Sequence, residues 1–222
     1  VVCYLREPVS WVASHYGQQV KRHGMTMRLS DLDVVDEYRQ MTSKIEQFCA
    51  VYPPDQLTFR LYDRAAFNGG DILSDFLGIL GIHDSKSMDR PQERINLSYT
   101  NSAVEYKRIW NKIDNSLAWL DLELQAYSDR QSQRSDLTRF MADSQIVELR
   151  EAYAPFFARL AEKRFIKDSR ALVPTRTTKE KSAFRQSGKQ EKNEFREITD
   201  FVKSRKRDSF LSLVVALERR AI

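Results

Sequence analysis

The sequence predicts an α/β fold built on a parallel sheet. Two short β-rich runs, Val1–Leu5 and Leu57–Tyr62, are each followed by residues with helical periodicity. Strands that alternate with helices are typical of parallel sheets, because a parallel pair needs a long crossover connection and a helix usually supplies it. Beyond Pro91 the pattern becomes mostly helical, so the C-terminal part is expected to be rich in helices.

Local signals mark where individual elements begin and end. Pro8 stands where a first helix would open, a position at which its missing N–H costs nothing, and Gly24 closes that helix. A second helix is expected to start within Ser30–Asp33. Asp71 is placed to cap a third helix, which should stop at Gly81.

The later part of the chain divides by composition. Helices are expected at about 102–120, 143–165 and 194–220, while residues 168–192 are polar, basic and poor in apolar side chains, as in a mobile linker. We therefore expect three parts: a partial α/β domain over 1–167, a basic linker over 168–192 and a C-terminal helix over 193–222.

Charge and hydropathy limit the classes of function. The chain has 222 residues and a net charge of +5, and residues 175–210 hold eleven basic and six acidic side chains, which is the whole excess. The rest is close to neutral, so the fold itself is not expected to bind nucleic acid. No apolar run approaches the roughly 20 residues of a membrane helix. With two cysteines and no disulfide framework, a cytoplasmic location is expected.

Arg6 suggests an anion site. It directly follows the first strand and precedes Pro8. Ligands of parallel sheets bind beyond the carboxyl ends of strands, and helix N-termini attract anions. Ser14 follows about two helical turns later, so a guanidinium fork and a hydroxyl could meet one phosphate. The alternative is a surface arginine paired with Glu7, with Ser14 as a small packing residue.

The stretch YLREPVSWVASHY resembles the 3′-phosphate-binding motif of the sulfotransferases that use 3′-phosphoadenosine 5′-phosphosulfate (PAPS). That motif is a hydrophobic strand, Arg, a variable residue, Pro, and Ser eight places after the Arg; Arg6, Pro8 and Ser14 match it. Three later stretches resemble the family in its order: LTFRLYDRAAFNGGDILSDFLGILGI, RINLSYTNSAVEYKRIWN and DSQIVELREAYAPFFARLAEKRF. The resemblance covers about Val1–Phe165.

The resemblance implies a P-loop NTPase-like fold with a central parallel sheet, PAPS as co-substrate and no metal. Arg6 and Ser14 would bind the 3′-phosphate of the nucleotide. Tyr62 would pack near the adenine, or else be a core tyrosine at a strand end. Arg94 and Ser98 lie in a segment that would close over the nucleotide, or else form a turn before the next helix.

The family's glycine-rich loop with its lysine, and its catalytic base, have no counterpart in this sequence. In the family they precede the Arg–Ser motif, so catalytic residues are unknown here and expected upstream of Val1. The chain would then be an incomplete, inactive piece of a sulfotransferase that anchors the nucleotide. The resemblance to bacterial and carbohydrate enzymes implies a hydroxyl acceptor on a saccharide or glycolipid. Oligomeric state stays open.

An alternative function is a non-catalytic interaction protein. The α/β body would be a degenerate scaffold, and the tail from Thr175 with its KSRKRD run would dock acidic protein, lipid headgroups or nucleic acid. The simplest interpretation of the tail is a solvated linker and a helix that packs on its own body. A glycine-rich loop with lysine upstream would favour the enzyme.

Overall fold

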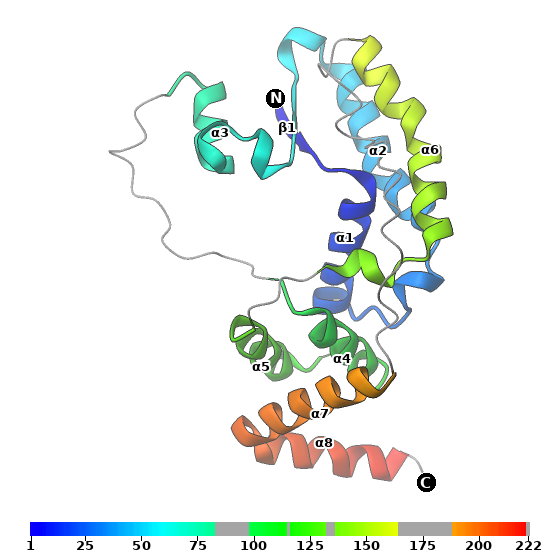
Figure 1. Ribbon diagram of the computed structural model, residues 1–222, viewed down its shortest axis with the longest axis vertical. Coiled ribbons are helices and arrows are strands. Elements are labelled where there is room, and N and C mark those ends of the chain that lie inside the picture. The colour runs from blue at the N-terminus through cyan, green and yellow to red at the C-terminus, as the bar shows by residue number, and fades with distance from the viewer. Residues whose placement is uncertain (83–97, 115, 132–135, 164–187, 221–222) are drawn as a thin grey trace. The chain divides into compact units, whose positions relative to one another are not determined.

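The computed structural model describes the chain except residues 83–97, 115, 132–135, 164–187 and 221–222 (Figure 1). The described residues form two compact units. The first takes residues from Val1–Val12, Asp33–Ile95 and Asp143–Lys179, and the second from Ala13–Leu32, Asn96–Ala142 and Glu180–Ile222. Helix α1, Pro8–His23, begins in the first unit and ends in the second.

Both predicted strands are confirmed, and they pair in parallel. β1 is Val2–Leu5 and β2 is Thr58–Leu61. Leu5 is the register partner of Leu61. The ladder extends one residue further, because the Tyr62 N–H donates to the Leu5 carbonyl at 2.7 Å. The residues after the two strands therefore lie at the same end of the sheet.

The predicted fold class is wrong. The described residues contain one sheet of two four-residue strands, and most of the others are helical, so there is no central parallel sheet of the P-loop NTPase type in this part of the chain. The prediction extended the strand–helix–strand order at the start of the chain to a whole domain. After β2, however, every regular element of the described chain is a helix or a 3-10 turn.

The helices of the first unit begin where the sequence indicates. α2 is Val34–Val51, α3 is Ile72–Ile79 and α6 is Asp143–Glu162. Asp33 and Asp71 cap α2 and α3: each carboxylate accepts a backbone N–H from three residues further on, at 2.9 Å. α2 and α6 run side by side (Figure 1).

An aromatic cluster holds α2 and α6 together. The Tyr38 ring is fully buried, with its centre 5.5 Å from that of Trp11 and 4.5 Å from that of Tyr153. The hydroxyl of Tyr153 donates to the Val35 carbonyl at 2.6 Å. Tyr38 is therefore a core residue of the first unit.

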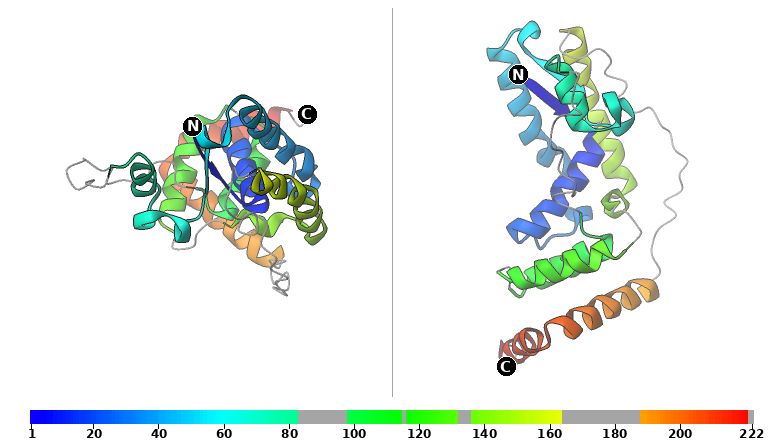
Figure 2. Two further views of the ribbon diagram at one scale, coloured as in Figure 1. Left: turned by 90° about the horizontal axis from the view of Figure 1, so that it is seen from above. Right: turned by 90° about the vertical axis from the view of Figure 1, so that its left-hand side faces the viewer.

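The second unit is helical. The helix predicted at 102–120 is two helices, α4 (Asn101–Asn111) and α5 (Ala118–Asp129). The helix predicted at 194–220 is also two, α7 (Gly188–Arg205) and α8 (Arg207–Arg220) (Figure 2). α7 packs on α4 and α5, and its Ile198 is fully buried. Most of the predicted linker lies outside the described residues.

Short 3-10 turns connect these elements in both units. They are Leu29–Asp31, Pro54–Gln56, Arg64–Ala66, Asn68–Gly70 and Leu137–Phe140.

Candidate functional site

The residues that follow the two parallel strands form the candidate site. Arg6 comes directly after β1, and Tyr62 directly after β2. The Cζ atom of Arg6 lies 5.8 Å from the centre of the Tyr62 ring, within the distance at which a cation is attracted to an aromatic face. The Tyr62 side chain is 47% exposed. The structure thus brings two of the predicted site residues together at an accessible position.

Glu7 does not neutralise Arg6. One Glu7 oxygen accepts the backbone N–H of Ser10 at 2.8 Å, and the other lies 3.7 Å from Nε of Arg150. Among the residues that the structure describes, no carboxylate forms an ion pair with Arg6. Its guanidinium therefore keeps donors and charge available for a ligand.

The N-terminus of α1 contributes less than the sequence suggested. The Glu7 carboxylate caps the helix and uses the N–H of Ser10, one of the groups that an anion would otherwise contact. Glu7 also places a negative charge there, which Arg150 partly offsets. A phosphate near Arg6 would depend chiefly on the guanidinium.

Phe67 supports the aromatic side of the site. Its ring meets that of Tyr62 edge-on, with centres 5.7 Å apart, and that of Tyr4 with centres 5.8 Å apart. Phe67 is buried. Edge-to-face packing of this kind is favourable and fixes ring orientation, so Phe67 limits the positions open to Tyr62.

A buried carboxylate holds together the strands and the turn that carry the site. Asp75, on α3, is fully buried and accepts hydrogen bonds from the Arg60 guanidinium, from the Tyr4 hydroxyl at 2.8 Å and from the Asn68 backbone N–H at 2.9 Å. The hydrogen bonds from Arg60 are the main cause that lowers the pKa of Asp75 to about 2. Burial, and then the hydrogen bond to Asp75, raises the pKa of Tyr4 to about 12.

This network fixes the turn that carries Phe67. Asn68 directly follows Phe67, and its N–H is held by Asp75. The turn continues through Gly69, whose φ of 73° is a left-handed conformation that favours glycine. Asp75 therefore positions the rings beside Arg6 without touching Arg6 itself. This network was not predicted, although Arg60 within the apolar run LTFRLY signals a buried partner.

Neither Ser14 nor Ser98 belongs to the unit that holds Arg6. Ser14 has an exposed side chain on the part of α1 that belongs to the second unit. Ser98 is exposed in the second unit, just before the buried Tyr99. Arg94 lies outside the described residues. Their roles in nucleotide binding stay predictions.

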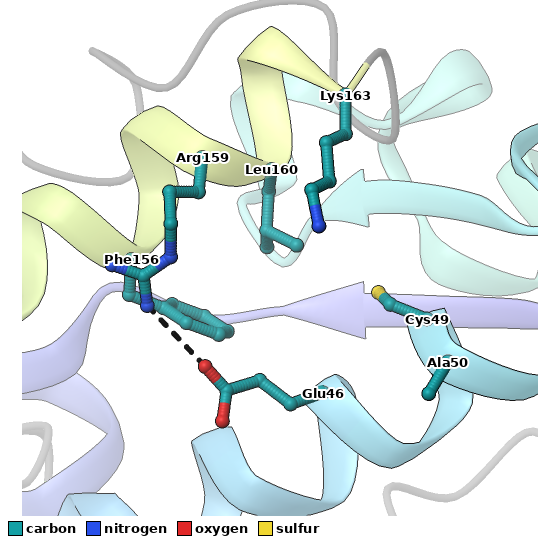
Figure 3. A pocket seen from close by; sticks show the side chains of 7 residues that line it. All are labelled: Glu46, Cys49, Ala50, Phe156, Arg159, Leu160 and Lys163. Atoms are coloured by element: carbon teal, nitrogen blue, oxygen red, sulfur yellow. Dashed lines mark hydrogen bonds and ion pairs between the residues drawn. The ribbon is translucent and has the colours of Figure 1, made fainter.

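A separate pocket of about 270 Å³ opens between α2 and α6 (Figure 3). Arg159 and Lys163 reach into it, but Arg159 already pairs with Glu46 at 3.3 Å. Cys49 also lines it, and burial raises the pKa of its thiol, which disfavours the reactive thiolate. The predicted site residues do not line this pocket, and its charged side chains are exposed.

The described part of the chain lacks two features. No three His, Cys, Asp or Glu side chains in this part are grouped so that they could hold a metal ion. Its helices also include none with the length and hydropathy required to cross a bilayer.

Comparisons with known proteins add little about function. No protein-family model and no solved structure matches the chain. A stretch of 94 residues is 33% identical to an uncharacterized protein of Archaeoglobus fulgidus, and it covers 42% of this chain and 24% of that relative. The match thus spans about a quarter of the relative's length, and the relative's description names no activity.

Proposed function

We propose that this chain binds PAPS through the 3′-phosphate of the nucleotide, as the anchoring part of a sulfotransferase. The observation that carries the proposal is Arg6 at the end of β1, beside Tyr62 and without a carboxylate partner in the described chain. A guanidinium can pair with phosphate through two parallel N–H···O bonds. The exposed Tyr62 ring offers a stacking surface for the adenine.

The resemblance of YLREPVSWVASHY to the sulfotransferase motif supports the same assignment and adds Ser14 as a second phosphate ligand. In the reaction, a base would take the proton of an acceptor hydroxyl. The hydroxyl oxygen would form a bond to sulfur while the bond from sulfur to the phosphate oxygen breaks. The acceptor would be a saccharide or glycolipid. No residue described above is assigned a part in the transfer step, so binding is the property to measure.

Calorimetry with adenosine 3′,5′-bisphosphate tests the role of Arg6. Loss of a charged hydrogen bond costs about 1.5–3 kcal/mol, so Arg6→Ala should bind roughly 10- to 150-fold more weakly than the parent chain. Arg39→Ala is the matched control, because Arg39 is an exposed arginine of the same unit that pairs with Asp36. Equal affinity of Arg6→Ala and the parent chain for the bisphosphate would reject the proposal.

A second nucleotide separates phosphate contacts from base contacts. Adenosine 5′-monophosphate lacks the 3′-phosphate, so Ser14→Ala and Arg6→Ala should weaken binding of the bisphosphate and leave binding of the monophosphate unchanged. Tyr62→Ala should weaken the binding of both nucleotides by about 1–3 kcal/mol, the contribution of base stacking on an aromatic ring. If Arg6→Ala lowered the affinity for both nucleotides equally, Arg6 would not contact the 3′-phosphate.

A further inference from the structure

Helix α8 is apolar on more than one side. Its middle reads FLSLVVAL from Phe210 to Leu217, which leaves a single serine among seven apolar residues. Phe210 is buried, and its ring meets that of Trp110 on α4 edge-on, with centres 6.0 Å apart. This side of α8 is therefore covered by the second unit itself.

A second stripe of α8 is apolar and exposed. Leu211 is 48% exposed and Val215 is 44% exposed, and their spacing of four places them one above the other on the same helix face. The solvent face of a helix in a globular protein is normally polar. Clustered exposed apolar side chains mark a surface that binds something less polar than water.

Basic side chains lie at the N-terminal end of this stripe. Arg207 precedes Leu211 by four residues on the same face, and Lys206 is exposed just before it. Lys203 is also exposed, but its ammonium lies 5.1 Å from the centre of the Phe210 ring, on the covered side of α8. In the described chain these three side chains form no ion pair with a carboxylate, whereas the neighbouring Arg205 pairs with Glu123. Asp208 is the one acidic side chain among them, so the local charge stays positive.

We propose that Lys206, Arg207, Leu211 and Val215, which we call the α8 surface, dock on anionic lipid membranes. A bilayer surface offers both groups that the α8 surface requires: negative headgroups for the cations and the acyl boundary for the apolar pair. A nucleic-acid duplex offers charge without an apolar partner. A second copy of the α8 surface would cover the apolar pair but would bring no acidic side chain to the cations.

Vesicle binding by the full chain tests this proposal. The chain should float with vesicles of phosphatidylcholine mixed with phosphatidylserine and stay behind with phosphatidylcholine alone. Each basic residue near an anionic surface contributes about 1 kcal/mol, so the double variant Lys206→Ala/Arg207→Ala should bind roughly 30-fold more weakly. The affinity of Leu211→Ser/Val215→Ser for these vesicles should fall about 10-fold, because the variant lacks the two apolar side chains that enter the acyl boundary.

Matched controls come from the first unit. Val147→Ser removes an apolar side chain that is 52% exposed on α6, and Lys44→Ala removes an exposed lysine of α2; both should bind vesicles like the parent chain. Far-UV circular dichroism confirms that each variant keeps its helices. Equal loss with a control and an α8 variant would overturn the proposal.

The other occupants give different results. Duplex DNA bound as tightly as vesicles, with no effect of Leu211→Ser/Val215→Ser, would assign the α8 surface to nucleic acid and overturn the lipid proposal. A dimer in size-exclusion chromatography that the same double variant converts to monomer, with vesicle binding unchanged, would assign it to a second copy. Arg6→Ala should leave vesicle binding intact, so the proposal stands apart from nucleotide binding.

Discussion

Asp75→Asn should destabilise the first unit strongly, although the change adds and removes no bulk. The carboxylate accepts bonds from Arg60, Tyr4 and the Asn68 N–H at a fully buried position. Its pKa of about 2 corresponds to about 2 kcal/mol of stabilisation of the ionised form relative to a free aspartate. The amide also turns one acceptor into a donor that faces the guanidinium. We expect a loss of about 2–4 kcal/mol in the free energy of unfolding.

Hydrogen exchange in a urea series is the appropriate assay, because the chain has two units and bulk signals would mix them. Peptides that cover β1 and β2 should lose protection at lower urea in Asp75→Asn, while peptides of α4 and α5 report the second unit and should not shift. Asp36→Asn is the matched control: Asp36 forms an exposed pair with Arg39, and such pairs contribute at most about 1 kcal/mol.

The pH dependence gives the same prediction a second readout. Because the folded chain keeps Asp75 ionised down to about pH 2, the unfolded chain binds the proton first as the pH falls. The stabilisation is thus complete above about pH 5 and is lost between about pH 4 and 2, and Asp75→Asn should show a flatter profile there. If β1 and β2 peptides of Asp75→Asn had the parent chain's urea midpoint, the network would not support the site.

Three further changes test the packing. Gly69→Ala should cost about 1–2 kcal/mol, since φ is 73° and the added Cβ would lie 2.8 Å from that of Ser74; thermal unfolding of the first unit measures this. Ile198→Ala should cost about 2–5 kcal/mol and speed exchange in α4 and α5 peptides only, because Ile198 is fully buried in the second unit. Asn111→Ala should cost about 2 kcal/mol by leaving the Val20 and Met25 carbonyls without its side-chain amide, and exchange at the end of α1 would report it.

Elements set by short-range chemistry could be predicted from the sequence. α1 begins at Pro8, and Gly24, which follows the end of that helix at His23, has a φ of 70°. The caps by Asp33 and Asp71 depend on a carboxylate that reaches an N–H three residues away, so no distant residue is involved. The strands at β1 and β2 follow from β-rich runs of the same kind.

The extent of the sheet could not be predicted in this way. The local pattern of a segment predicts that the segment forms a strand. The number of strands that pair beside it depends on residues elsewhere in the chain. The division between α4 and α5 was missed because apolar periodicity continues through the break. In the structure, Asn111 at the end of α4 bonds the Val20 and Met25 carbonyls, which lie far away in sequence.

In the candidate site, too, the features set by local sequence were predicted and those set by distant residues were not. Arg6 was predicted from its place after a strand, and the register of β1 and β2 then explains why Tyr62 lies beside it. The support provided by Asp75 was not predicted. A charged pair can be recognised in a sequence when its members are close together along the chain, and Arg60 and Asp75 are 15 residues apart. Arg60 and Asp75 are brought together by the turn between β2 and α3.

The position of Glu7 indicates which group would hold the phosphate. A strand end followed by a helix offers two ways to bind an anion: the helix N–H groups or a side-chain cation. Glu7 caps α1, and its carboxylate accepts the Ser10 N–H that an anion would otherwise contact. That carboxylate would also repel a second anion at the helix end, where Arg150 offsets its charge only across 3.7 Å. An anion bound at this edge of the sheet would therefore depend chiefly on the Arg6 guanidinium, which lies beside the Tyr62 ring.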